Sequence, residues 1–135
     1  MTYRIVEQTP SVADYMRLRD AGHLTPFSED AARRGLASSW FCICVIQAGR
    51  IIGMGRIIGD GGCFFQIVDI VVEPDHRGQG LGKEIMEALM ARLNSHAPKS
   101  AFVSLMADVP ADKLYAQFGF RPTAPRSIGM SLTLK

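Results

Sequence analysis

The chain has 135 residues, a length that suits one domain with its own hydrophobic core and is short for two ordinary domains. Hydrophobic residues make up 47% of it and charged residues 21%, as in soluble globular proteins. The formal net charge is +2 and no Lys/Arg block occurs, which argues against nucleic acid or a membrane as the main partner. The apolar runs are shorter than a membrane span, and the N-terminus lacks the apolar core of a signal peptide, so we expect a cytoplasmic protein.

The first half of the sequence predicts a strand, two helices and a hairpin. Apolar residues at helical spacing follow Ser11, and the side chain of Ser28 can cap a second helix. The turn Ala48-Gly49 separates two runs rich in aromatic and β-branched residues, which is a hairpin pattern. The predicted elements are strand 3–7, helix 11–19, helix 28–38, strand 40–47 and strand 51–58.

The second half predicts alternating strands and helices. A glycine-rich turn precedes an apolar strand, and a later run repeats Leu or Ile every four residues, as in an amphipathic helix that ends before Pro98. Alternation near the C-terminus predicts a final strand. The predicted elements are strand 64–72, helix 80–96, buried strand 102–107, helix 111–118 and strand 128–134.

The resulting order is β-α-α-β-β-β-α-β-α-β. It predicts an α+β fold in which helices flank a mixed, mostly antiparallel sheet, rather than a doubly wound Rossmann domain. We expect residues 1–135 to form a single domain.

The segment Arg77-Gly78-Gln79-Gly80-Leu81-Gly82 lies between a predicted strand and a predicted helix. Glycines at a helix N-terminus expose backbone N–H groups, and the helix dipole favours an anion there. A dinucleotide fingerprint does not fit, because Lys83 stands at its third glycine position. A P-loop does not fit either, because Arg77 replaces its first glycine and Glu84 follows Lys83.

The pattern that fits is [QR]-x-x-G-x-[GA], which Arg77, Gly80 and Gly82 satisfy. In this segment the chain resembles the GCN5-related N-acetyltransferase (GNAT) superfamily, whose loop of this form binds the pyrophosphate of acetyl-coenzyme A. Residues 108–120 are similar to that family's N-x-x-A-x-x-L-Y-x-x-x-G-F signature. The matching residues are Ala111, Leu114, Tyr115, Gly119 and Phe120. Asp108 departs from the pattern, because the family has an asparagine there that contacts the cofactor.

The resemblance covers roughly residues 40 to 122 and implies a GNAT-like sheet with splayed central strands. It implies that Ile70, Val71 and Val72 hold the pantetheine arm of acetyl-CoA through main-chain atoms. The pyrophosphate would bind the loop formed by Arg77, Gly78, Gln79, Gly80, Leu81, Gly82 and Lys83. Lys83 can equally be a solvated lysine of the first helical turn, and Asp108 is a candidate cofactor contact.

Amine acetylation needs an oxyanion donor, an acid for the departing thiolate and a base for the amine. A backbone N–H near Val72 can stabilise the oxyanion, and the resemblance makes Tyr115 the candidate acid. Asp69 is a lone acid in an apolar strand, so it is either a base or a carboxylate satisfied by an amide or an arginine. Other candidate bases are His23, Glu29 and Glu73, of which Glu73 is expected to face solvent.

The cysteines and histidines do not suggest a metal site. Cys42, Cys44 and Cys63 have no histidine at ligand spacing, so we interpret the thiols as small hydrophobic side chains in a reducing compartment.

Two functions remain open. The first is acetyl-CoA-dependent transfer of an acetyl group to a primary amine of a small molecule or an exposed protein amine. The second is a catalytically inactive acyl-CoA-binding module, and Tyr115 favours the first because binding alone needs no acid. The expected partners are acetyl-CoA and an amine acceptor, and a homodimer is left open. Nucleic acid, a membrane and a metal are not expected.

Overall fold

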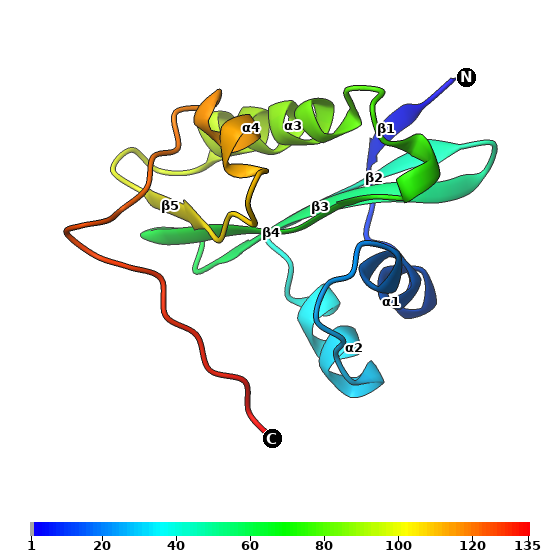
Figure 1. Ribbon diagram of the computed structural model, residues 1–135, viewed down its shortest axis with the longest axis horizontal. Helices are drawn as coiled ribbons and strands as arrows, with labels where there is room; N and C mark the ends of the chain where they lie inside the picture. Colours follow the sequence, from blue (N-terminus) through cyan, green and yellow to red (C-terminus); the bar gives the residue numbers. More distant parts are fainter. Residues whose placement is uncertain (1) are drawn as a thin grey trace. The chain divides into compact units, whose positions relative to one another are not determined.

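A five-stranded sheet organises the first part of the chain in the computed structural model, which describes residues 2–135 (Figure 1). The strands lie in the order β1-β2-β3-β4-β5, and every neighbouring pair is antiparallel except β4 and β5. Their bounds are β1 Arg4–Glu7, β2 Phe41–Gln47, β3 Arg50–Gly59, β4 Phe64–Val72 and β5 Phe102–Leu105. The predicted mixed, mostly antiparallel α+β fold is confirmed.

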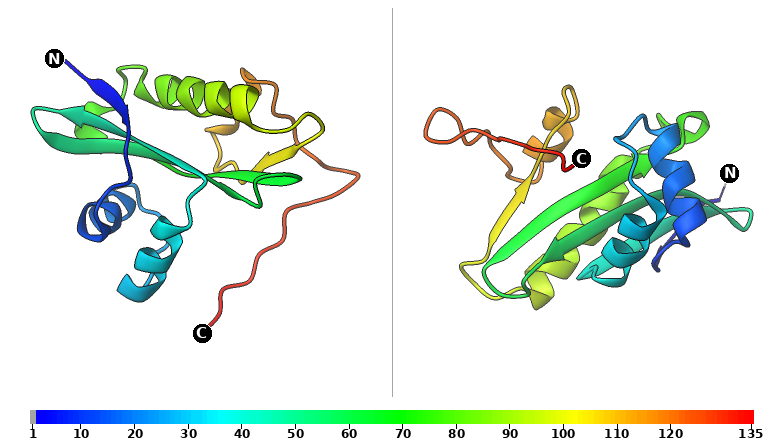
Figure 2. Two further views of the ribbon diagram at one scale, coloured as in Figure 1. Left: turned by 180° about the vertical axis from the view of Figure 1, so that it is seen from behind. Right: turned by 90° about the horizontal axis from the view of Figure 1, so that it is seen from below.

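The chain divides into two compact units, Met1–Leu105 and Met106–Lys135, which are described separately. In the first unit, α3 covers one face of the sheet, and α1 and α2 lie on the other (Figures 1 and 2). The helices are α1 Val12–Ala21, α2 Glu29–Ala37, α3 Leu81–His96 and the short 3-10 helix η1 Pro74–His76.

Side-chain caps begin both helices on the α1–α2 face. Ser11 Oγ accepts from Asp14 N–H and Ser28 Oγ accepts from Ala31 N–H, each at 3.1 Å, so the predicted cap at Ser28 is confirmed. On this face a buried cluster joins the helices to the sheet. Its members are Tyr15, Leu18, Ala32, Leu36, Cys44, Ile51, Met54 and Val71.

The long helix α3 buries the stripe that its repeat predicts. Its buried residues are Leu81, Ile85, Met86, Leu89 and Leu93. A Cβ at Gly55 of β3 would lie 2.5 Å from Ile85 Cγ2, so the glycine lets α3 approach the sheet closely. This packing fixes the start of α3 next to the end of β4.

In the second unit, α4 spans Asp112–Ala116, inside the predicted helix 111–118. The predicted strand 128–134 is wrong, because these residues have no strand structure and are exposed. A strand requires a hydrogen-bonded neighbouring strand. Alternating side chains give the segment an apolar face, but they do not ensure that a second strand pairs with its backbone.

The strand predicted over 102–107 is also shorter and less buried than expected. β5 ends at Leu105, and Phe102 is 54% exposed because β5 is the edge of the sheet. Among the described residues, no helix is long and apolar enough to cross a membrane.

Candidate functional site

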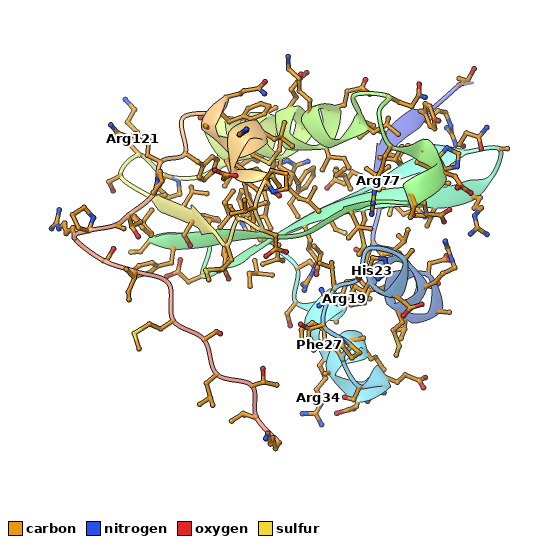
Figure 3. All side chains as sticks on the ribbon, in the orientation of Figure 1. Arg19, His23, Phe27, Arg34, Arg77 and Arg121 are labelled. Atoms are coloured by element: carbon orange, nitrogen blue, oxygen red, sulfur yellow. The ribbon has the colours of Figure 1, made fainter. Side chains whose placement is uncertain are left out.

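The loop from β4 to α3 has the backbone of an anion cradle. Gly78 and Gly80 have φ values of +79° and +77°, in the left-handed region that favours glycine. A Cβ at either residue would have no heavy atom within 4 Å, so the space beside both glycines is open. Arg77 lies at this loop (Figure 3) and is exposed.

The N-terminus of α3 leaves amide groups available beside those glycines. Its N-cap is Gly80, which provides no side-chain cap. Glu84 N–H donates to Gly80 O at 3.2 Å, so the amides of Leu81, Gly82 and Lys83 precede the first helical hydrogen bond. These amides and the helix dipole attract negative charge, and the exposed Lys83 adds a cation to the same turn.

The end of β4 has a free backbone edge within the first unit. Pairing with β5 runs from Phe64–Phe102 to Ile67–Leu105 and stops there, where β5 ends. Glu73 N–H donates to Ile52 O at 2.8 Å, so the opposed residues Gly53 and Val72 form a non-hydrogen-bonded pair. The N–H and C=O of Val72 therefore point away from β3, and its C=O accepts from Arg77 Nε at 3.2 Å.

A β-bulge interrupts β4 just before that edge. Met54 pairs with Val71 and Arg56 with Val68, so two steps along β3 match three steps along β4. Asp69 has a φ of +60° at this point, a conformation that aspartate tolerates better than most residues. The extra residue changes which side chains face each side of the sheet. Ile70 lies near the α3 face beside Gly55, and Val71 packs against Gly22 after α1.

The bulge directs the Asp69 carboxylate into a buried network on the α1–α2 face. Asp69 Oδ2 accepts from Tyr15 OH at 2.7 Å and from Arg56 Nε at 3.0 Å, and Asp69 Oδ1 pairs with Arg19. The Asp69 side chain is 4% exposed. Both of its oxygens are therefore engaged by donors.

The two arginines extend this network to other elements. Arg56 also donates to Gly35 O at 3.0 Å and to Ser39 Oγ at 3.1 Å. Arg19 donates to Thr25 O, and its Cζ lies 4.3 Å from the centroid of the Phe27 ring. Figure 3 shows Arg19, His23 and Phe27 on the α1–α2 side of the sheet. The network thus ties the bulge to α1, α2 and the segment that joins them.

This arrangement matches the second interpretation of Asp69, a carboxylate satisfied by arginine. The expectation for Glu73 is wrong, because its side chain is 12% exposed and pairs with Arg17 and Arg50. The two arginines reach it from α1 and β3, which the sequence order does not reveal. His23 and Glu29 are exposed in the α1–α2 segment.

The sequence alone did not identify Arg19 and Arg56, two buried arginines of the described chain, as partners of Asp69. The sequence did contain a signal for Arg56. It lies within an apolar run, and a buried acid such as Asp69 needs a hydrogen-bonding or cationic partner. No buried side-chain nitrogen or oxygen among residues 2–135 lacks a hydrogen-bond partner, which shows how completely this network is satisfied.

A small hollow of about 100 Å³ lies beside the network. It is lined by Tyr15, Met16, Arg19, Asp20, Leu24, Pro26 and Phe27. Ligand sites for drug-sized molecules are about 300–1,000 Å³, so this hollow could hold only a small group.

The second unit contains Tyr115 and Asp108. Tyr115 is half-buried in α4, and burial, followed by the negative charge of Asp108, raises the pKa of its phenol. The phenol therefore stays protonated to higher pH than a free tyrosine. Asp108 is exposed, and its carbonyl accepts from Ala111 N–H at 2.7 Å at the start of the helical segment.

The cysteines show no arrangement for catalysis. Cys42 and Cys44 are buried and Cys63 is exposed. The neighbouring Cys42 thiol and burial raise the pKa of Cys44, whose thiol donates to Gln8 O at 3.2 Å. Within residues 2–135, no group of three or more His, Cys, Asp or Glu side chains could hold a metal ion.

The sequence pattern of the acetyltransferase (GNAT) domain matches residues 11–131. The chain therefore belongs to the GNAT acetyltransferase family. A solved protein of unknown function from methicillin-resistant Staphylococcus aureus, described as a probable acetyltransferase, is similar over 98% of this chain and 100% of its own. The two are 43% identical, with a TM-score of 0.94.

Curated relatives match a shorter stretch. GCN5-related N-acetyltransferase 2, chloroplastic, from Arabidopsis thaliana is 35% identical over 74 residues, which is 55% of this chain and 28% of that protein. Serotonin N-acetyltransferase 2, chloroplastic, from Oryza sativa subsp. japonica is 36% identical over 74 residues, 55% of this chain and 36% of the relative. The chain thus spans well under half the length of these two relatives.

Proposed function

We propose that the protein is an acetyl-CoA-dependent N-acetyltransferase that acetylates a primary amine of a small molecule or an exposed amine of a protein. The observation that carries the proposal is the loop Arg77–Lys83, with open left-handed glycines at the uncapped start of a long helix. Membership of the GNAT acetyltransferase family supports the reaction class.

The residues of the loop fit a pyrophosphate. Such a group needs backbone N–H donors, positive charge and room for its oxygens. The amides of Leu81, Gly82 and Lys83 supply donors, and the space beside Gly78 and Gly80 is open. Arg77 and Lys83 supply exposed positive charge. We therefore assign the pyrophosphate of acetyl-CoA to this loop and the pantetheine arm to the free edge of β4 at Ile70, Val71 and Val72.

Acetyl-CoA, when bound, supplies an acetyl group activated as a thioester. The Val72 N–H lies on the free edge of β4 and is our candidate donor to the carbonyl oxygen as negative charge develops on it. The pairing of β4 with β3 already fixes the direction of the Val72 N–H, so this donor needs little reorganisation as the charge develops.

Tyr115 is our candidate proton donor to the departing thiolate. A phenol is protonated at neutral pH, and burial followed by the charge of Asp108 raises its pKa further, so proton donation would depend on the position of the hydroxyl and not on its intrinsic acidity.

We assign no base to the amine. Asp69 is engaged by Tyr15, Arg19 and Arg56, and we propose that it positions the bulge rather than accepting the amine proton. His23 and Glu29 are the exposed candidates in the α1–α2 segment. A serotonin N-acetyltransferase among the relatives supports an amine acceptor as a class without selecting one.

Calorimetric titration with acetyl-CoA tests the assignment of the loop. Gly80→Glu places a charged side chain in the open space of the cradle, and we expect Kd to rise at least about tenfold, or about 1.4 kcal/mol. Gly61→Glu is the matched control, because Gly61 has a φ of +80° and open surroundings but lies in the turn before β4. Both variants carry the same backbone strain, so equal affinities in the two would refute the assignment.

The same preparations distinguish a transferase from a binding module. Thiol release from acetyl-CoA is measured over a panel of amine classes, and Tyr115→Phe is compared with the native protein. We expect this variant to retain acetyl-CoA affinity and to lose about 10²–10⁴-fold in turnover where chemistry limits the rate. Binding of acetyl-CoA without amine-dependent thiol release would favour the binding module.

A further inference from the structure

The buried network around Asp69 contains more positive than negative charge. Arg19 and Arg56 are 8% and 9% exposed, and the Asp69 side chain that pairs with both is 4% exposed. Two guanidinium groups therefore share one carboxylate. Among residues 2–135, no other carboxylate forms an ion pair with either arginine. A buried charge without a counter-charge is costly, so a further anion beside these arginines would be stabilised.

Arg19 has hydrogen-bond donors left for such an anion. A guanidinium group has five N–H donors. The bonds of Arg19 to described residues use Nε–H and one hydrogen on Nη2 for Thr25 O, and one hydrogen on Nη1 for Asp69. One N–H on each terminal nitrogen therefore remains, and a pair of guanidinium N–H groups suits the two oxygens of a carboxylate.

The hollow of about 100 Å³ lies directly beside this arginine. Tyr15, Arg19 and Phe27 are among the residues that line it, and Figure 3 shows Arg19 and Phe27 on the same side of the sheet. The volume suits a single small group, such as a carboxylate, rather than a whole acceptor molecule. The aromatic rings of Tyr15 and Phe27 exclude water from part of the wall, which strengthens the attraction between a guanidinium group and an anion.

The hollow lies near the end of β4. Met16 and Leu24 line it, and both pack against the buried cluster that contains Val71. Val71 directly precedes Val72, whose N–H is the candidate oxyanion donor. A group in the hollow is therefore separated by one layer of side chains from the strand end to which the thioester is assigned.

An acid also lines the hollow. Asp20 is exposed, so water and salt screen its repulsion of an anion more than they screen the attraction of the buried Arg19. The same carboxylate attracts an ammonium group. The hollow thus combines a buried cation with an exposed anion, which is complementary to a molecule that has both an acidic group and an amine.

We propose that the hollow is an anion subsite, in which Arg19 binds a carboxylate of the amine acceptor. The inference rests on the proposed N-acetyltransferase function and narrows its acceptor to amino carboxylic acids, in preference to amines without an acidic group. Arg19 is then a residue that determines acceptor specificity. The bound carboxylate supplies the counter-charge that the Asp69 network lacks.

A titration without acetyl-CoA tests the subsite. The probe is propionate, added to the ¹⁵N-labelled protein while NMR follows the Arg19 Nε–H signal and the amides of 16–27. We expect these signals to shift to saturation with propionate and to stay in place with propionamide, which has the same shape without the charge. Signals that do not move with propionate, or that move equally with propionamide, overturn the proposal.

Two substitutions of Phe27 test the role of charge at the hollow. Phe27 is 46% exposed, and its ring centroid lies 4.3 Å from Arg19 Cζ, so its replacement should leave the chain folded. Phe27→Glu and Phe27→Gln both remove the ring, but only Phe27→Glu places a carboxylate beside Arg19. We expect Kd for propionate to be at least about tenfold higher in Phe27→Glu than in Phe27→Gln. Equal Kd values in the two variants overturn the proposal.

Turnover tests whether the anion belongs to the acceptor. Thiol release is measured with β-alanine and with γ-aminobutyrate, each against its own carboxamide. We expect kcat/KM to be at least about tenfold higher for at least one acid than for its amide, and Phe27→Glu to remove this preference. Propionate should inhibit competitively against that acid. Binding of propionate without competition would make the anion a separate effector and overturn the proposal.

The outcomes separate this inference from the function on which it rests. A protein that acetylates the amides as well as the acids keeps the proposed N-acetyltransferase function and overturns the acidic acceptor. A protein that acetylates no amine refutes the proposed function and the acceptor assignment together.

Discussion

Asp69 joins more parts of the first unit than any other acid described above. Its carboxylate receives donors from α1 and β3, and its own backbone forms the bulge in β4. A buried ion pair adds little net stability relative to apolar packing, but removal of one partner leaves an uncompensated charge. The single carboxylate faces two buried guanidinium groups, so its removal would leave both of them without their acidic partner.

We expect Asp69→Asn to lower the free energy of unfolding by about 3–5 kcal/mol, because Arg19 and Arg56 lose their buried counter-charge. Urea unfolding measures this change. Asp75→Asn, the same substitution at an exposed residue of η1, should change it by less than about 0.5 kcal/mol.

The pH dependence of turnover then separates a positioning role from a role as base. If Asp69 positions the bulge, Asp69→Asn in its folded fraction keeps the acidic limb of the pH–rate profile of the native protein. Loss of that limb with retained acetyl-CoA affinity would instead identify Asp69 as the base.

At the scale of elements, the loop site depends on how closely α3 packs on the sheet. The contact is closest at Gly55, where a Cβ would lie 2.5 Å from Ile85 Cγ2 and 3.2 Å from Leu89 Cδ1. Ile85 and Leu89 both belong to the fully buried stripe of α3. Any side chain at Gly55 must therefore push the helix outward, and the start of α3 moves with it.

We expect Gly55→Ala to destabilise the protein by about 1–3 kcal/mol through overpacking. Gly62→Ala is the control, because its Cβ would meet only Asp60 Oδ1, at an ordinary 3.8 Å. Thermal unfolding of the two variants provides the comparison. A Gly55→Ala variant as stable as Gly62→Ala would show that α3 can move away from the sheet without cost.

At the scale of the whole molecule, the phenols of Tyr15 and Tyr115 make the free energy of unfolding depend on pH in the alkaline range. Burial and then Asp69 raise the pKa of Tyr15, while burial and then Asp108 raise that of Tyr115, each from 10.0. The folded state therefore holds protons that the unfolded state releases near pH 10. Stability from these phenols is fully present below that pH and is lost as the pH rises through the folded-state values.

We expect the free energy of unfolding to fall above about pH 10 more steeply in the native protein than in a Tyr15→Phe/Tyr115→Phe double variant. Urea unfolding at closely spaced pH values measures both slopes. Equal slopes would contradict the prediction, whatever the absolute stabilities of the two proteins.

The sequence by itself determined the elements whose stability is local. The four-residue repeat of α3, the cap at Ser28 and the apolar run of β4 all predicted elements that the structure contains. The family was also readable, because the residues of the β4–α3 loop lie next to one another in the chain and the backbone conformations there require glycine at Gly78 and Gly80.

The tertiary structure decided what depends on distant partners. Asp69 was ambiguous in sequence because Arg19 and Arg56 approach it from 50 and 13 residues away, and the bulge that directs it has no local signature. Glu73 was misplaced for the same reason, since Arg17 reaches it from 56 residues away. Segment 128–134 has the alternation of a strand, but backbone pairing needs a second strand, and a side-chain pattern alone cannot provide one.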